Sequence, residues 1–523
     1  MLKQLLVLGA IGVLIAAPLT LRERPAAVAL SRQTLVIITP HGEGIRSEFT
    51  QAFRAWAARE RHQDVDIDWR TPGGTSEITR YLDGRFAAAF AFAQPQFTAS
   101  ARKAFNQAKL PADASDAQRA ARTAFLASNI GVDVDLLFGG GEFPFRGHAA
   151  KGYLVDAGVV QRQPQWFTGT TPIIPQMLSG ETVYDPQGRY FSACFALFGI
   201  AWSPDRLADL GLSTPPTRWE DLGTPAYFKQ LTLADPTKSG AVVTAMERII
   251  QQRMAETLGA DGQPDLAAGW RDGFALLKRM VANSRAITDS ASKPTRDTVR
   301  GDCLASMAID FQAKSEAEWA LHESDGKPRL EFTVPAGGTS VSGDPIALLR
   351  GAPHPELAKA FIEFVLSPEG QRLWNYRLGV PGGPRQYALR RMSVRRDLYT
   401  AADRAQMSDP DTDPFTVAET FTYHPAWTAA YYPLIGPLVK ATALDPRGEL
   451  TRAWEAIIRA GGPARVPEAW EEFTWLPFAY AEAAAVRDAL AKGPEIAVPL
   501  QREWLETATI HYRLARAYAE AGR

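Results

Sequence analysis

The sequence predicts an α/β protein with two lobes and a helical C-terminal extension. A strand, a polar loop and an amphipathic helix follow one another at residues 35–53, and a second strand, VDIDW, lies at residues 65–69. Apolar runs that alternate with helices start again near residue 190, whereas the chain after about residue 400 is rich in Ala, Glu and Arg and lacks strand patterns. Strands that alternate with helices are typical of layered α/β domains.

Length and charge limit the possible functions. The chain has 523 residues, of which 46% are hydrophobic, so it can form more than one domain with its own core. It carries 57 Lys and Arg residues against 58 Asp and Glu residues, and both signs are spread along the chain. Such a balance creates no long-range field toward a polyanion. We therefore expect no nucleic-acid partner.

Residues 1–25 have the pattern of a targeting segment. Lys3 provides a positive charge, and residues 4–17 form an apolar run that is shorter than the roughly 20 residues of a membrane span. A small-x-small cleavage site is not evident, and neither cysteine lies near this segment. The pattern predicts a cleaved signal peptide or an uncleaved N-terminal membrane anchor, and a periplasmic protein in either case.

The two cysteines, Cys194 and Cys303, both lie in apolar runs. Two cysteines in an exported chain can form a disulfide, but a buried free thiol also packs as a small hydrophobic group, so both alternatives stay open. Neither cysteine has the spacing of a zinc site or of a CxxC motif. We expect no structural metal and no cofactor.

The loop after the first strand carries His41 and Glu43. Open α/β sheets hold ligands at the carboxyl ends of parallel strands, so both side chains are candidate ligand contacts. The following strand leads to a loop, TPGGTSE, in which Thr75 or Ser76 can cap the next helix.

A third strand, VDVDLLFGGGEF, ends in three glycines. Because glycine has no side chain, Gly140 and Gly141 allow a ligand to approach the backbone closely. Both are candidate contacts.

The second lobe provides further candidates. Ser239, Gly240 and Ala241 precede a long helix, so free N–H groups and the helix dipole favour an anion there; an ordinary helix cap without a ligand is the alternative. Asp289 and Ser290 lie in a polar loop before another helix. In the later segment EFTVPAGGTSVSGDPIALL, Ser342 and Asp344 either contact a ligand or cap the turn into the next helix.

Six ordered segments resemble the extracellular solute-binding proteins of ABC importers, in particular the ferric-ion-binding branch. They are HGEGIRSEFTQAF, DLLFGGG, WEDL, LADPTKSGAVVTAM, GDCLASMAIDF and SGDPIALLRGAPHPELAKAFIEFVLSPEGQRLW, within about residues 33–395. The resemblance implies a type 2 periplasmic binding fold, in which hinge strands join two α/β lobes around a ligand cleft. It also implies a small-molecule ligand and delivery to an ABC permease in the inner membrane.

The resemblance also implies domain boundaries. We expect lobe 1 at residues 33–190 and 335–400, lobe 2 at residues 191–334, and a helical extension at residues 401–523. The extension is either a brace packed across the lobes or a contact for another protein. Tyr431 and Tyr432 are expected to pack inside it.

The chain departs from the iron-binding branch at two places. That branch has a histidine after the first strand, as at His41, and a serine-glycine-alanine stretch that holds an anion, as at Ser239. However, it has a glutamate where this chain has glycines 139–141, and adjacent tyrosines where residues 310–312 are Asp-Phe-Gln. Bare ferric iron is therefore not favoured. Asp310 either contacts an amine, hydroxyl or metal, or is satisfied by the backbone.

The candidates together favour a small polar, anionic solute. Ferric iron or an iron chelate is the first alternative, and a periplasmic ligand sensor or accessory protein is the second. HExxH, GxSxG and P-loop motifs are absent from the sequence, so an enzyme is not favoured. A hydrolase with paired carboxylates is the weakest alternative.

Overall fold

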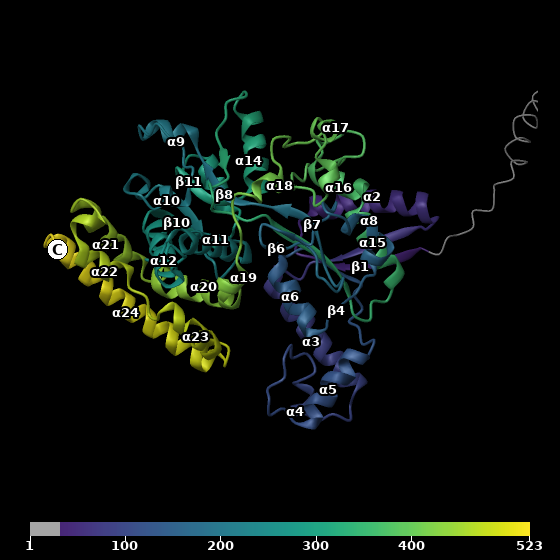
Figure 1. Cartoon of the computed structure of the whole chain (residues 1–523). Helices are drawn as coiled ribbons and strands as arrows, with labels where there is room; N and C mark the ends of the chain where they lie inside the picture. The colour runs from purple at the N-terminus through teal and green to yellow at the C-terminus, as the bar shows by residue number, and fades with distance from the viewer. Residues whose placement is uncertain (1–31) are drawn as a thin grey trace, which may run out of the picture.

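The computed structural model describes residues 32–523. The targeting segment predicted at residues 1–25 lies outside this range. Within the described residues, every helix is too short or too polar to cross a membrane. Figure 1 shows two α/β lobes beside each other, with C-terminal helices on the outer side of one of them. The predicted fold class is confirmed.

A six-stranded sheet forms the first lobe. β1 (Gln33–Ile38) runs parallel to β2 (Val65–Arg70) and β3 (Leu136–Phe138), so the loops after these strands meet at one edge of the sheet. β13 (Ser342–Leu349) follows antiparallel to β3 and also pairs with two other strands, β4 (Leu154–Val155) and β7 (Phe191–Ala196).

Helices cover both faces of this sheet. One face packs against aromatic side chains of α2 (Glu43–Arg61), α15 (Pro355–Leu366) and α16 (Pro368–Asn375). The opposite face packs against α3 (Thr75–Ala93), α5 (Asp116–Ala127) and α6 (Glu142–Lys151). Both cores contain several phenylalanines, each of which buries a large apolar area.

The second lobe has a five-stranded sheet. Its strands, in spatial order, are β10 (Ser284–Thr288), β9 (Leu231–Ala234), β11 (Ala305–Ile309), β8 (Phe198–Trp202) and β12 (Glu331–Thr333). One face packs against α11 (Gly240–Glu256) and α12 (Leu266–Ala282). The other face packs against α13 (Lys293–Val299) and α14 (Asp310–Glu323).

The chain passes between the lobes at three places. It crosses at Leu197 between β7 and β8, and it returns at residues 334–341 between β12 and β13. The third crossing, at residues 419–424, joins α18 (Pro414–Val417) on the first lobe to α19 (Pro425–Thr428) on the second.

Strand pairing corrects two of the expected boundaries. β7 pairs with β13, so residues 191–196 belong to the first sheet and not to the second lobe. Residues 415–418 pack in the core of the first lobe, so the extension does not begin at residue 401. The apolar run from 190 to 202 has the same pattern in either sheet, because both sheets bury their strands on two faces. The sequence therefore does not show where it crosses.

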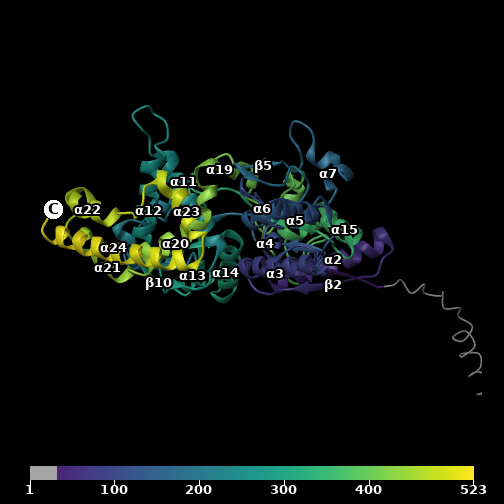
Figure 2. The ribbon, with the colours of Figure 1, turned by 90° about the horizontal axis from the view of Figure 1, so that it is seen from below.

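We call residues 425–523 the C-terminal layer. Its main helices are α20 (Tyr432–Val439), α21 (Arg447–Arg459), α22 (Pro467–Thr474), α23 (Ala483–Leu490) and α24 (Pro494–Glu520). Trp454 and Tyr512 of the layer share one hydrophobic core with Trp270 and Phe274 of α12. Figure 2 shows most of the layer lying against the second lobe. It is therefore fused to that lobe, and it reaches the first lobe through Tyr432, which stacks on Phe143.

Cys194 lies in β7, and Cys303 precedes β11. Both are buried free thiols. The disulfide alternative is therefore wrong, because the two cysteines belong to the sheets of different lobes.

Candidate functional site

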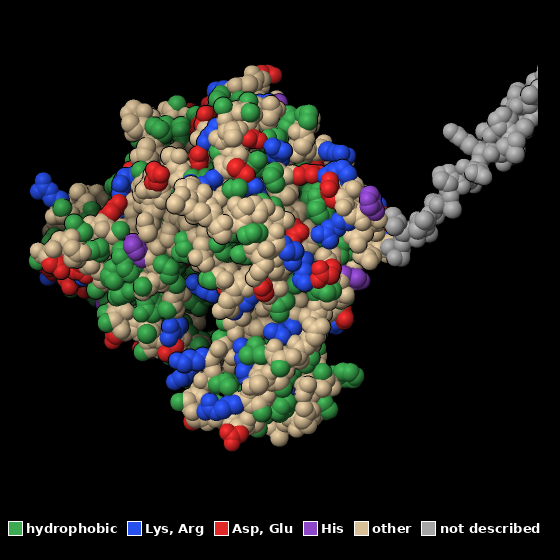
Figure 3. All heavy atoms as spheres, turned by 45° about the vertical axis from the view of Figure 1, so that its right-hand side comes forward, with side chains coloured by type: hydrophobic (Ala, Val, Ile, Leu, Met, Phe, Trp, Pro, Cys, Tyr) green, Lys and Arg blue, Asp and Glu red, His purple; other side chains and the backbone are tan. Residues whose placement is uncertain are grey.

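The two lobes face each other across a hollow that the space-filling view shows as a notch with Lys and Arg side chains around it (Figure 3). Three groups of polar residues lie where the lobes meet.

The first group is the Asp344 cluster, formed by His41, Asp344 and Arg391. Asp344 Oδ2 lies 2.9 Å from His41 Nε2 and accepts a hydrogen bond of 2.8 Å from Arg391 Nη1. Asp344 Oδ1 accepts hydrogen bonds from the backbone N–H groups of Gly140 and Gly141, at 2.7 and 3.3 Å. Burial alone would raise the pKa of Asp344, but His41 and Arg391 hold this pKa well below its usual range.

The glycines after β3 fit this cluster. Gly139 has a φ of +86°, and a Cβ there would lie 2.3 Å from His41 Nε2. Only glycine accommodates both the backbone angle and the close approach of the imidazole. The N–H groups of Gly140 and Gly141 bind the Asp344 carboxylate, whereas the sequence suggested that they face a ligand.

Asp310 lies at the start of α14 on the second lobe. It is 1% exposed, and neither of its carboxylate oxygens has a hydrogen-bond partner. Its own backbone N–H donates to Leu197 O at the first crossing, at 3.0 Å. Burial raises the pKa of Asp310 to about 6. A buried carboxylate without a partner is costly, so this position favours a proton or a ligand with a donor group.

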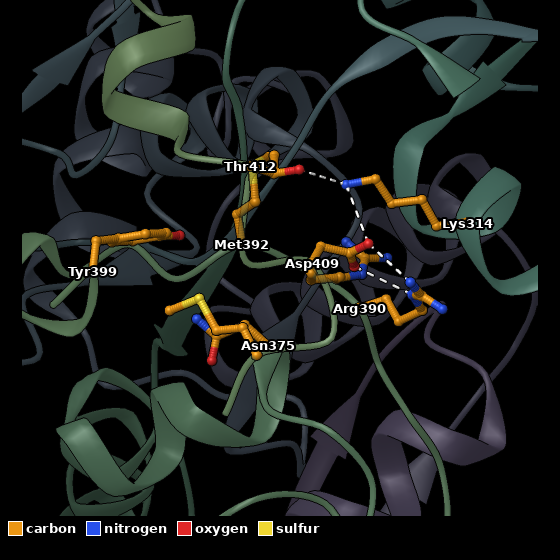
Figure 4. A pocket seen from close by; sticks show the side chains of 9 residues that line it. Lys314, Asn375, Arg390, Met392, Tyr399, Asp409 and Thr412 are labelled. Carbon is orange, nitrogen blue, oxygen red and sulfur yellow. Dashed lines mark hydrogen bonds and ion pairs between the residues drawn. The ribbon is translucent and has the colours of Figure 1, made fainter. Parts of the chain in front are cut away.

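Cationic side chains from both lobes surround a small cavity near Asp310 (Figure 4). Lys314 Nζ of α14 donates to Thr412 Oγ1 at 2.9 Å, and Arg390 forms an ion pair with Asp409 at 2.8 Å. The Asn375 side chain lines the cavity and has no hydrogen-bond partner. The cavity volume is about 10 Å³, which is room for one water molecule.

Arg391 connects the Asp344 cluster to this cavity. Its guanidinium lies 4.0 Å from the centre of the Phe311 ring of the second lobe. Sequence reasoning missed Arg390, Arg391, Lys314 and Asn375, because they lie in segments without a recognisable motif. The adjacent arginines at 390 and 391, next to apolar residues, are the one pattern that could have indicated a buried cation.

The second group is the Arg248 cluster, formed by Glu181, Glu247, Arg248, Ser340 and Tyr423. Arg248 donates to Glu181 and Glu247 at 2.6 Å each, and to Ser340 at 2.6 Å. Its guanidinium lies 3.9 Å from the centre of the Tyr423 ring. Burial alone would lower the pKa of Arg248, but the two glutamates hold this pKa well above its usual range.

The Arg248 cluster joins the lobes. Glu181 belongs to a hairpin of the first lobe, β5 (Met177–Leu178) and β6 (Glu181–Thr182), whereas Arg248 lies on α11. Ser342, a predicted ligand contact, donates to Glu181 Oε1 at 3.0 Å. It therefore belongs to this network.

The third group lies at the start of α11. Ser239 is the N-cap residue, but its side chain makes no capping hydrogen bond. The Gly240 carbonyl accepts a hydrogen bond of 2.8 Å from Tyr432 Oη of the C-terminal layer. The Tyr432 ring stacks on Phe143 of the first lobe, with ring centroids 4.3 Å apart. Burial raises the pKa of Tyr432 to about 12.

The remaining predicted contacts are dispersed. Thr75 lies near the glycine loop, where its Oγ1 is 3.4 Å from Gly140 O. Glu43, Ser76, Asp289 and Ser290 are exposed at helix or strand ends. Ala241 is half-buried in the first turn of α11.

The two adjacent tyrosines of the C-terminal layer contact different lobes. Tyr431 packs on Trp270, as the sequence predicts, whereas Tyr432 faces the first lobe. Across residues 32–523, no cluster of three or more His, Cys, Asp and Glu side chains is arranged to hold a metal ion.

Residues 145–401 match the profile of a family described as bacterial extracellular solute-binding proteins. Just under half of the chain is therefore similar to that family. The resemblance inferred from the six sequence segments is confirmed, because they resemble the same class of extracellular solute-binding proteins.

Three curated relatives are similar to parts of the chain. An uncharacterized protein of Haemophilus influenzae is 30% identical over 36% of this chain and 48% of its own length. The phosphoglycerate transport regulatory protein PgtC of Salmonella typhimurium is 30% identical over 34% of this chain and 38% of its own length. A putrescine/agmatine-binding protein of Pseudomonas aeruginosa is 23% identical over 44% of this chain and 61% of its own length. The chain thus spans about half the length of the first of these relatives, and less of the second.

Two solved structures are also similar. The periplasmic binding protein AfuA of Actinobacillus pleuropneumoniae, with fructose-6-phosphate bound, is 18% identical, with a TM-score of 0.48, and the match covers 81% of this chain and 97% of AfuA. Iron-bound HitA of Pseudomonas aeruginosa is 15% identical, with a TM-score of 0.48, and the match covers 77% of this chain and 98% of HitA.

Proposed function

We propose that this protein binds a small polar, anionic solute between its two lobes and delivers it to an ABC-type permease in the inner membrane. Export to the periplasm, by a cleaved signal or with an N-terminal anchor, is part of this proposal. The observation that carries it is the buried contact between the lobes, where the unpartnered Asp310 carboxylate lies beside cations of both lobes.

This arrangement suits a solute with two kinds of polar group. Lys314, Arg390 and Arg391 provide positive charge for a phosphate or carboxylate. Asp310 provides an acceptor for a hydroxyl or amine, as its lack of a partner suggests. Phosphate esters of small sugars or hydroxy acids carry both kinds of group.

Solute entry requires the lobes to separate. The cavity of about 10 Å³ is far smaller than a metabolite. The contacts that close it, Lys314 with Thr412 and Arg391 with Phe311, each join one lobe to the other. Three crossing segments permit a hinge motion of this kind, because they hold the lobes together while these contacts break.

The experiment that tests the proposal is a titration of purified protein with phosphoglycerate, fructose 6-phosphate, putrescine, and ferric iron with phosphate. We expect a phosphate ester to give the largest thermal shift, since ligand at 100 times its Kd stabilises a protein by about 2.7 kcal/mol. Lys314→Gln should weaken this binding at least tenfold, whereas the exposed Arg459→Gln should not change it. A larger shift with ferric iron would favour the iron-binding alternative.

A ligand sensor is the second candidate function. It is favoured by the printed name of one relative, a transport regulatory protein. Deletion of the gene separates the two functions: loss of solute uptake with intact expression of transport genes supports delivery, and loss of that expression supports sensing.

A further inference from the structure

The C-terminal layer places Tyr432 at the boundary between the lobes, although the matched family region ends at residue 401. We propose that Tyr432 and Phe143 form a closing contact that keeps the lobes together and sets the rate at which bound solute leaves. Tyr432 is thus a positioning residue of the solute site. This inference rests on the proposed function for its kinetic part only.

Tyr432 is fixed to the second lobe. Its Oη donates to Gly240 O at 2.8 Å and lies 3.2 Å from Thr244 Oγ1, and both partners belong to α11. The residues that follow it, Leu434 and Ile435, are buried in the core that the layer shares with the second lobe. The phenol ring therefore cannot move away from α11 while the layer remains folded.

Phe143 is fixed to the first lobe. It lies in the first turn of α6, which begins directly after the three glycines and packs against β13. Phe145, two residues later, is buried in the core of the first lobe. The guanidinium of Arg146 lies 5.5 Å from the centre of the Phe143 ring.

The two rings meet face to face. Their centroids are 4.3 Å apart, and their planes make an angle of 25°. Within residues 32–523, this is the one aromatic pair that joins the first lobe to the second lobe or its layer. Because each ring is fixed to a different lobe, opening of the lobes must break the stack. The contact therefore favours the closed arrangement.

The stack is coupled to solute through closure of the lobes. It lies beside the first turn of α11, where Ser239, Gly240 and Ala241 were predicted to face an anion. Because a solute held between the lobes leaves only when they open, a contact that favours closure should slow its departure. Stacked aromatic pairs contribute enough to change an equilibrium roughly twofold to tenfold, so a change of that size in the dissociation rate is expected.

The kinetic test uses fructose 6-phosphate and stopped-flow measurement of its dissociation. Tyr432→Ala and Phe143→Ala should each raise the dissociation rate roughly twofold to tenfold. The double variant should be no faster than the faster single variant, because both changes remove the same contact. Tyr432→Phe keeps the ring and should restore the rate to within about twofold of the parent. Phe92→Ala, which removes an aromatic ring that is 90% exposed on the first lobe, should have no effect.

A merely structural role predicts a different result. If Tyr432 only contributed to packing, Tyr432→Ala would lower the thermal midpoint, and its effect on the dissociation rate would not depend on whether Phe143 is present. Strictly additive effects of the two alanine variants on the dissociation rate, or an unchanged rate in both, would overturn the proposal.

A distance measurement tests closure without any solute. Spin labels are attached at Ala120→Cys on α5 and Ala485→Cys on α23, which are both exposed, whereas the native thiols are buried. In solute-free protein, Tyr432→Ala should shift the distance distribution to longer values, and Tyr432→Phe should not. Identical distributions in the parent and Tyr432→Ala overturn the closing contact. If no titrated solute binds but this shift occurs, the proposed function fails and the closing contact stands.

Discussion

The Arg248 cluster and Asp310, which lies beside the Asp344 cluster, both bury charge between the lobes, but they differ in how their hydrogen bonds are satisfied. In the Arg248 cluster, the arginine donates to Glu181, Glu247 and Ser340. Beside the Asp344 cluster, the Asp310 carboxylate has no partner on either oxygen. A satisfied buried network fixes one arrangement, whereas an unsatisfied group retains its capacity for a ligand.

This difference assigns the clusters different roles. The Arg248 cluster includes Tyr423 of the third crossing and Ser340 of the second, so it stabilises the hinge side of the interface. The region around Asp310 and Arg391 is the part that solute binding can change. Substitutions in the Arg248 cluster should therefore lower the stability more than the solute affinity. Substitutions around Asp310 and Arg391 should lower the solute affinity more than the stability.

The largest expected effect is on stability, in Arg248→Met. This change leaves Glu181 and Glu247 buried without a cation, so the free energy of unfolding should fall by about 3–5 kcal/mol. Urea titration at pH 7 measures it. The control is Arg459→Ala, whose ion pair with Glu455 is exposed and should contribute less than about 1 kcal/mol. A loss near that of the control would show that the Arg248 cluster does not hold the lobes.

Asp310→Asn should show the opposite behaviour. Because burial raises the pKa of Asp310 from 3.8 to about 6, ionisation destabilises the folded parent as the pH rises from 4 through 6. The variant lacks this charge, so its stability relative to the parent should increase across this range by about 2 kcal/mol. Unfolding measurements at pH 4 and pH 7 check it.

The same variant should bind solute more weakly, because the amide is a poorer acceptor than the carboxylate. Equal stability differences at both pH values would mean that Asp310 is not a buried, unpartnered acid. An unchanged solute affinity of Asp310→Asn would show that Asp310 does not contact the solute.

Gly139→Ala should damage the Asp344 cluster specifically. The positive φ and the contact of the new Cβ with His41 should lower the stability by roughly 1–3 kcal/mol. Gly147→Ala on α6 is the matched control, since a Cβ there meets nothing within 4 Å, and it should be neutral or stabilising by up to about 1 kcal/mol. Calorimetry compares the two variants; similar midpoints would contradict the need for glycine at 139.

The smallest expected effect is that of Ser342→Ala. Its hydroxyl donates one hydrogen bond to Glu181, so the stability should fall by about 1 kcal/mol. Solute affinity should not change, because the hydroxyl belongs to the Arg248 cluster. A threefold or greater loss of affinity in the same titration would instead make Ser342 a solute contact, as its place in the sequence first suggested.

Particular residues show how far sequence reasoning extends into the site. The sequence offered His41, Gly140, Gly141 and Asp344 as separate candidate contacts of one cleft, and the structure brings them together. It could not predict that Asp344 would bind His41, or that Arg391 would complete the cluster. These partners are separated by up to about 300 residues, and local patterns carry no information about such pairs.

The sequence by itself determined the fold class and the helical character of the C-terminal region, because strand and helix periodicity and the spacing of apolar residues are local properties. Only the tertiary structure decided where the chain crosses between the lobes, and that the C-terminal layer shares its core with the second lobe. It alone decided which charges are paired and that Tyr432 meets Phe143. Those outcomes depend on which surfaces exclude water from each other, and that is settled only when distant segments pack together.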